Sequence, residues 1–109
     1  MLAVAEDLLD ESRRAAVLRA FLRPDGSLRS IPARRAKRLV LLDRLSQVFD
    51  VGVRYPEPEV NALLRAFHPD VAALRRYLVD EGFMTRDAGV YWRSGGTVVL
   101  GSDPDQPSG

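Results

Sequence analysis

The order of apolar residues and helix breakers in residues 54–93 constrains the fold of this chain more than any other feature. Four apolar residues recur three and four positions apart, as on one face of a helix: Val60, Leu63, Leu64 and Phe67. Pro69 lacks a backbone N–H and disfavours helical geometry in the residue before it, so this helix is expected to end near Phe67. The same proline suits the first turn of a second helix, with Asp70 at its positive end. Two short helices separated by a tight break are therefore predicted.

A predicted hairpin follows the second of these helices. The inner face of that helix carries three apolar residues, Val71, Leu74 and Leu78. Gly82 suits the position just after the helix, where a positive φ is common. Residues 83–86 and 90–93 have the composition of strands and flank a turn at residues 87–89. Residues 54–55 are expected to form a short strand that pairs with this hairpin.

Two further helices are predicted before residue 54. Residues 33–49 have the clearest helical period, with an apolar stripe that contains Leu41, Leu42, Leu45, Val48 and Phe49. Residues 3–22 are rich in alanine and leucine and contain no glycine or proline, which favours a long helix. Residues 24–27 form a turn, and residues 28–31 form either an edge strand or an extended linker.

The order of these elements predicts an α+β fold that is mostly helical. A winged helix-turn-helix domain is expected at residues 33–93, preceded by the long N-terminal helix and its linker at residues 1–32. Residues 94–109 are expected to contain a short strand at residues 97–100 and then a disordered tail. The tail is predicted from its composition, because residues 101–109 are glycine, proline and polar residues.

The composition excludes several classes of function. The chain has no cysteine, which excludes disulfides, thiolate metal sites and thiol nucleophiles. His68 is the only histidine, which argues against a metal site. We find no glycine-rich phosphate loop and no catalytic set of residues, so we expect neither an enzyme nor a cofactor. No signal peptide and no apolar run of about 20 residues is visible, so a cytoplasmic protein without membrane contact is expected.

The charge distribution permits nucleic-acid binding without arguing for it. The formal net charge is +1, but residues 29–93 hold twelve basic and eight acidic residues. Candidate contacts to double-stranded DNA lie on or beside the predicted helix-turn-helix and its wing. These candidates are Arg34, Arg35, Lys37, Arg38, Arg65, His68, Ala72, Arg76 and Arg86.

Several of these candidates have a plain structural alternative. The basic run at residues 34–38 forms either a phosphate clamp or a solvated face. Arg76 points outward from its predicted helix and either contacts DNA or is an idle surface residue. His68 either caps or hinges the helix break, or it contacts DNA. Arg86 lies at the wing, within reach of a minor groove. Asp70 counts against DNA binding, because an exposed carboxylate there would face phosphates.

Three residues are assigned structural roles: Arg75, Glu59 and Asn61. Arg75 falls on the margin of the inner helix face, where a half-buried guanidinium needs a carboxylate partner. Glu57 or Glu59 on the preceding helix can supply that carboxylate. Asn61 is placed to brace the helix pair through a side-chain hydrogen bond.

A series of short motifs is distributed over residues 17–93. The motifs are Leu18-Arg19-Ala20-Phe21-Leu22, Asp25-Gly26, Ile31-Pro32-Ala33, Lys37-Arg38-Leu39, Tyr55, Glu59-Val60-Asn61, Phe67-His68, Asp70, Leu74-Arg75-Arg76, Gly82-Phe83 and Tyr91-Trp92-Arg93. In these residues the chain resembles a family of bacterial domains of unknown function, which occur alone or after the winged helix of ArsR-type repressors. The resemblance implies a bacterial, regulatory protein. Pro56 departs from the family pattern, which has a capping Thr or Ser there, so the helix start must rest on Pro56 or Pro58.

Two hypotheses for the function follow. The first is a bacterial transcriptional regulator or regulatory module that binds DNA through its winged helix. The second is a protein-interaction or dimerisation module with the same fold and no DNA binding. The N-terminal helix favours a homodimer, with packing back onto the chain's own residues 41–45 as the alternative. Its apolar surface is expected to contain Ala15, Ala16, Leu18, Phe21 and Leu22.

Overall fold

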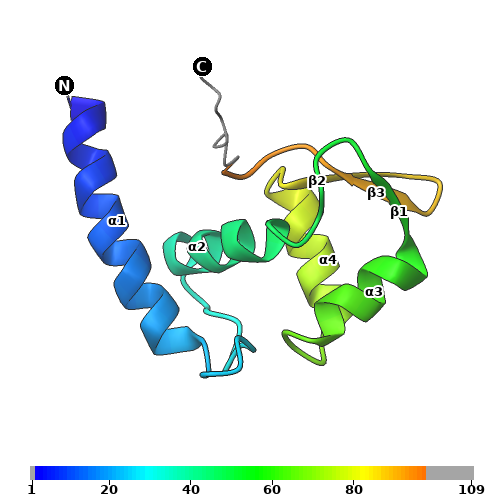
Figure 1. Cartoon of the computed structure of the whole chain (residues 1–109), viewed down its shortest axis with the longest axis horizontal. Helices are drawn as coiled ribbons and strands as arrows, with labels where there is room; N and C mark the ends of the chain where they lie inside the picture. The colour runs from blue at the N-terminus through cyan, green and yellow to red at the C-terminus, as the bar shows by residue number, and fades with distance from the viewer. Residues whose placement is uncertain (1, 98–109) are drawn as a thin grey trace, which may run out of the picture.

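The computed structural model describes residues 2–97, which form four helices and one three-stranded antiparallel sheet (Figure 1). The elements follow the order α1 (Leu2–Phe21), α2 (Arg35–Ser46), β1 (Arg54–Pro56), α3 (Glu57–Arg65), α4 (Val71–Asp80), β2 (Met84–Asp87) and β3 (Val90–Arg93). The α+β class is therefore as predicted, and about half of the chain is helical. The predicted strand at residues 97–100 and the predicted tail lie almost wholly outside the described residues.

The ends of α3 and α4 follow from local chemistry. Helix α3 begins directly after Pro56, with Pro58 in its first turn, as the loss of a capping hydroxyl requires. It ends at Arg65, slightly before the predicted position. Asp70 caps α4 by accepting a hydrogen bond from the Ala73 N–H at 3.1 Å. The tight break between two short helices is confirmed.

Helix α2 is shorter than its apolar stripe suggests. It covers Arg35–Ser46, whereas the period predicts a helix over residues 33–49. Phe49 is fully buried even though it follows the helix. Val48 is 36% exposed, so the prediction that it faces the core is wrong. The helical phase stops at Ser46, and the turn after it rotates Val48 away from the stripe.

The three strands pair in the order β1-β3-β2. Tyr55 of β1 lies opposite Tyr91 of β3, which confirms the predicted pairing of residues 54–55 with the hairpin. Strands β2 and β3 are joined by Ala88 and Gly89, which both have positive φ values, 51° and 79°. Two such residues form the tight turn whose twist matches that of a two-stranded ribbon.

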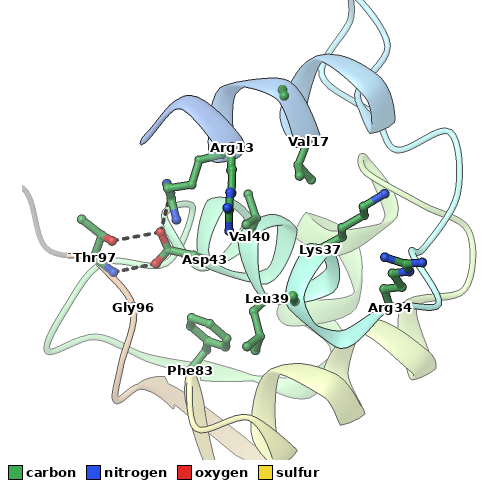
Figure 2. Close-up of a pocket in the computed structure, with 13 residues that line it drawn as sticks. Arg13, Val17, Arg34, Lys37, Leu39, Val40, Asp43, Phe83, Gly96 and Thr97 are labelled. Carbon is green, nitrogen blue, oxygen red and sulfur yellow. Dashed lines mark hydrogen bonds and ion pairs between the residues drawn. The ribbon is translucent and has the colours of Figure 1, made fainter. Parts of the chain in front are cut away.

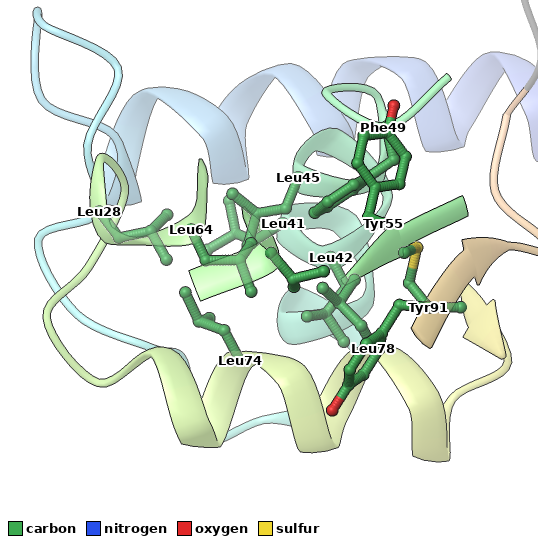
Figure 3. Packing of buried hydrophobic residues seen from close by; sticks show 12 residues of the cluster. Leu28, Leu41, Leu42, Leu45, Phe49, Tyr55, Leu64, Leu74, Leu78 and Tyr91 are labelled. Atoms are coloured by element: carbon green, nitrogen blue, oxygen red, sulfur yellow. The ribbon is translucent and has the colours of Figure 1, made fainter. Parts of the chain in front are cut away.

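The core lies between the helices and one face of the sheet (Figure 3). Its buried apolar residues are Leu28, Leu41, Leu42, Leu45, Phe49, Tyr55, Val60, Leu64, Leu74, Leu78, Met84 and Tyr91. Leu28 comes from the segment after α1, and its N–H donates to the Phe67 carbonyl oxygen at 2.8 Å. This loop segment therefore belongs to the same core as the helices of residues 35–80.

Helix α1 lies beside α2 at the end of the molecule away from the sheet (Figure 1). Three apolar residues of α1 and the residue just after it pack against the core and are half-buried: Val17, Leu18, Phe21 and Leu22. That part of the helix surface is covered within the chain, while Ala15 and Ala16 are exposed. Pairing of α1 with a second copy stays a prediction. None of the described helices is both long and apolar enough to cross a membrane.

Candidate nucleic-acid interface

The outer side of α4 and the hairpin together form an open hollow of about 310 Å³. It brings together three of the predicted DNA contacts, Ala72 and Arg76 from α4 and Arg86 from β2. Ala72, Arg76 and Arg86 are all exposed. The guanidinium of Arg86 also lies over the Tyr91 ring, with 6.0 Å to the ring centroid. Two cations from different elements, α4 and β2, thus face one surface.

Arg75 lines the same hollow but is occupied by protein partners. It donates a short hydrogen bond to the side-chain oxygen of Asn61, and its Nη2 lies 3.7 Å from a Glu57 carboxylate oxygen. Glu57 also accepts a hydrogen bond from the Tyr91 hydroxyl at 2.9 Å. Of the two carboxylates considered as partners for Arg75, Glu57 is the one in contact, and Glu59 is exposed. Arg75 therefore ties α4 to α3.

The contrast between neighbouring arginines on α4 gives a first prediction. Arg75→Ala is expected to lower the free energy of unfolding by about 1–3 kcal/mol, because Asn61 and Glu57 lose a half-buried partner. Arg76→Ala removes an exposed side chain and is the matched control, expected to stay within about 0.5 kcal/mol. Urea denaturation of both variants measures the difference. Equal losses would contradict this orientation of α4.

The basic run at the start of α2 does not form one patch. Arg35 makes a bidentate ion pair with Glu81, at 2.7 and 2.9 Å. These hydrogen bonds lower the pKa of Glu81 and raise that of Arg35. The Arg38 guanidinium lies 4.4 Å from the Tyr77 ring centroid and donates to the Ala33 carbonyl. Two members of the predicted phosphate clamp are therefore engaged with α4 or with the preceding loop.

Arg34 and Lys37 point elsewhere, into a groove between α1 and α2 (Figure 2). The groove has a volume of about 810 Å³ and shares no lining residue with the hollow beside α4. The four basic residues of the run are close together in the sequence but have three different environments. Arg35 binds Glu81, Arg38 lies over Tyr77, and Arg34 and Lys37 line the groove.

The turn between α3 and α4 holds two of the remaining candidates. The His68 Nδ1 accepts the Asp70 N–H at 3.0 Å, which is the geometry of a turn-stabilising residue. The Asp70 carboxylate accepts the Ala73 N–H at the start of α4. Arg65 is exposed at the end of α3 and does not line the hollow.

Asp43 is a buried charged residue that sequence reasoning missed. Its side chain accepts hydrogen bonds from Arg14 at 2.8 Å, from the Thr97 N–H at 2.6 Å and from the Thr97 hydroxyl at 2.9 Å. Burial raises the pKa of Asp43, but the hydrogen bonds from Thr97 and Arg14 outweigh it and hold the pKa below its usual value. The available signal was a carboxylate directly after Leu41 and Leu42, on the predicted helix with the clearest apolar stripe.

The close approach of the C-terminal segment to α2 depends on Gly96. Its φ is +88°, and a Cβ at this position would come within 2.6 Å of the Ser46 hydroxyl oxygen. The absence of a side chain lets the backbone at Thr97 reach Asp43. Residues 96–97 therefore close one end of the groove between α1 and α2 (Figure 2).

The helices and the sheet make this a small α+β protein. Within the described residues, no group of potential metal ligands is clustered. The chain belongs to the bacterial family described as uncharacterized protein conserved in bacteria (DUF2087), which it matches over residues 27–93. The matched range begins after α1 and includes α2, α3, α4 and all three strands. Neither the curated proteins nor the solved structures contain a match to this chain.

Proposed function

We propose that this protein is a bacterial DNA-binding regulatory module with a winged-helix fold. In this proposal α4 is the helix that enters the major groove, and the β2–β3 hairpin is the wing. The succession of α2, β1, α3, α4, β2 and β3, with strand order β1-β3-β2, supports the assignment. The resemblance to domains that follow ArsR-type repressors supports a regulatory setting.

The observation that carries the proposal is the shared exposure of Arg76 and Arg86 at one hollow. Arginine pairs with phosphates and with guanine edges through its planar fork of donors. Arg76 would contact bases or phosphates from α4, while Arg86 would contact the backbone or minor groove from the hairpin. Asp70 caps α4 but is exposed and keeps its negative charge, so the phosphate contacts are placed at Arg76 and Arg86 and not at the front of α4.

A titration of the full chain against random-sequence duplex DNA at several salt concentrations tests the proposal. Affinity is expected to fall as salt rises, because bound cations displace condensed counterions. Arg76→Ala and Arg86→Ala are each expected to weaken binding and to reduce the salt slope by about 1 if the lost contact is to phosphate. Arg44→Ala is the control, because Arg44 is exposed on α2 and lines neither the hollow nor the groove.

Two outcomes would contradict this function. One is the absence of binding at low salt, with circular dichroism showing that the chain is folded. The other is equal weakening by Arg44→Ala and Arg76→Ala, which would indicate a diffuse attraction without a defined interface. Either outcome would leave a protein-interaction module as the better proposal, in keeping with the modest charge surplus and with Asp80 at the hollow.

A further inference from the structure

The groove between α1 and α2 has the dimensions of a small-molecule site. Its volume of about 810 Å³ falls within the roughly 300–1,000 Å³ that is usual for ligand pockets. One wall comes from α1 and the other from α2, while Phe83 and Thr97 approach from the C-terminal part of the chain (Figure 2). The proposed DNA contacts on α4 and β2 do not line it, so this site is separate from the proposed function.

The middle of the groove is apolar. Val17 of α1, Leu39 and Val40 of α2, and Phe83 are half-buried there and present hydrocarbon to the groove (Figure 2). A ligand body that covers these side chains would remove apolar surface from water on both sides of the contact. A bare inorganic anion would leave that surface exposed, so the groove fits a ligand with an apolar portion.

The two ends of the groove differ in charge. At one end Asp43 is the acid among the described lining residues, and its carboxylate is already paired with Arg14 and hydrogen-bonded by Thr97. The exposed Arg13 lines the groove at this end as well (Figure 2). At the other end lie Arg34 and Lys37, both exposed (Figure 2). Neither of these two forms an ion pair within the part of the chain whose side chains are described. The end at Arg34 and Lys37 therefore offers two cations with no carboxylate beside them among the lining residues that the structure describes.

We propose that this groove binds a small organic anion, a monocarboxylate carried on an acyl chain. The carboxylate would lie between Arg34 and Lys37, and the acyl chain would extend over Val17 and Val40 toward the Asp43 end. The apolar walls favour the chain over water, and the two cations select an anionic head over a neutral one.

Calorimetric titration of the full chain with decanoate, below the concentration at which it forms micelles, tests the site. Saturable binding is expected, and decan-1-ol should bind at least about fivefold more weakly because it lacks the charge. Octanoate should bind more weakly than decanoate by two- to fourfold for each methylene lost, since a fully buried methylene corresponds to about fourfold. Amide shift changes measured by NMR should centre on residues of α1 and α2 that line the groove.

A charge variant and its matched control locate the head group. The double variant Arg34→Gln with Lys37→Gln is expected to bind decanoate about fivefold more weakly, because two exposed ion pairs are lost. Arg44→Gln removes one positive charge from the same helix outside the groove and should bind as the natural chain does. The proposal is overturned by the absence of saturable binding at millimolar decanoate, by equal binding of decanol, by affinity independent of chain length, or by equal weakening in the control.

Discussion

Replacement of Phe49 with alanine is expected to lower the free energy of unfolding by about 3–5 kcal/mol. Phe49 is fully buried, and its ring lies edge-on to Tyr55 with 5.1 Å between ring centroids. The substitution leaves a cavity bounded by the end of α2 and by β1. It also removes the surface that holds Tyr55, whose hydroxyl oxygen accepts the Asp50 N–H at 2.8 Å.

Urea denaturation followed by circular dichroism measures this loss. Val51→Ala is the control, since Val51 lies two residues away and is 61% exposed. That change is expected to stay within about 0.5 kcal/mol. A loss below about 1 kcal/mol for Phe49→Ala would show that the segment after α2 does not pack as described.

Asp43→Ala is expected to cost about 2–3 kcal/mol at neutral pH. The change leaves the Arg14 guanidinium and two donors of Thr97 without their common acceptor. Asp50→Ala is the comparison, because Asp50 is exposed in the loop after α2 and its side chain takes no part in this network. Similar losses for the two variants would contradict the role assigned to the buried carboxylate.

The same carboxylate gives a pH dependence of defined sign. The folded-state pKa of Asp43 lies below its ordinary value of 3.8, so the unfolded chain takes up a proton first as pH falls. Its stabilising contribution is therefore complete at neutral pH and is lost as pH falls below that value and through the lowered pKa. The difference in unfolding free energy between the natural chain and Asp43→Asn is expected to shrink between about pH 4 and pH 2. A constant difference over that interval would contradict the lowered pKa.

Local chemistry explains why the sequence predicts α3, α4 and the hairpin well. The break at Pro69, the cap at Asp70 and the turn at Ala88-Gly89 each act within a few residues. Such signals can be read without knowledge of the neighbours in space. The end of α2 lacks a signal of this kind, because Val48 and Phe49 are equally apolar in the sequence but only Phe49 is buried.

The arrangement of the charged residues depends on distant partners and could not be predicted in the same way. Arg35 pairs with Glu81, which is 46 residues away, and this pair divides a basic run that is continuous in the sequence. The groove likewise exists only because α1 packs beside α2, which periodicity cannot distinguish from pairing with a second copy. Helical phase did indicate that Arg75 and Arg76 differ, because it depends only on their own helix.

The bonding of Asp43 also determines which parts of the chain should open together in native-state hydrogen exchange. Arg14 lies 29 residues before Asp43, and Thr97 lies 54 residues after it. Arg14 and Thr97 both bind the Asp43 carboxylate. Release of either one therefore exposes that carboxylate to water and weakens its bond to the other. The second half of α1 and residues 94–97 should therefore behave as one cooperative unit, with a common opening free energy below that of α3 and α4. Decanoate in the groove would slow exchange in the second half of α1 and in residues 94–97 at once.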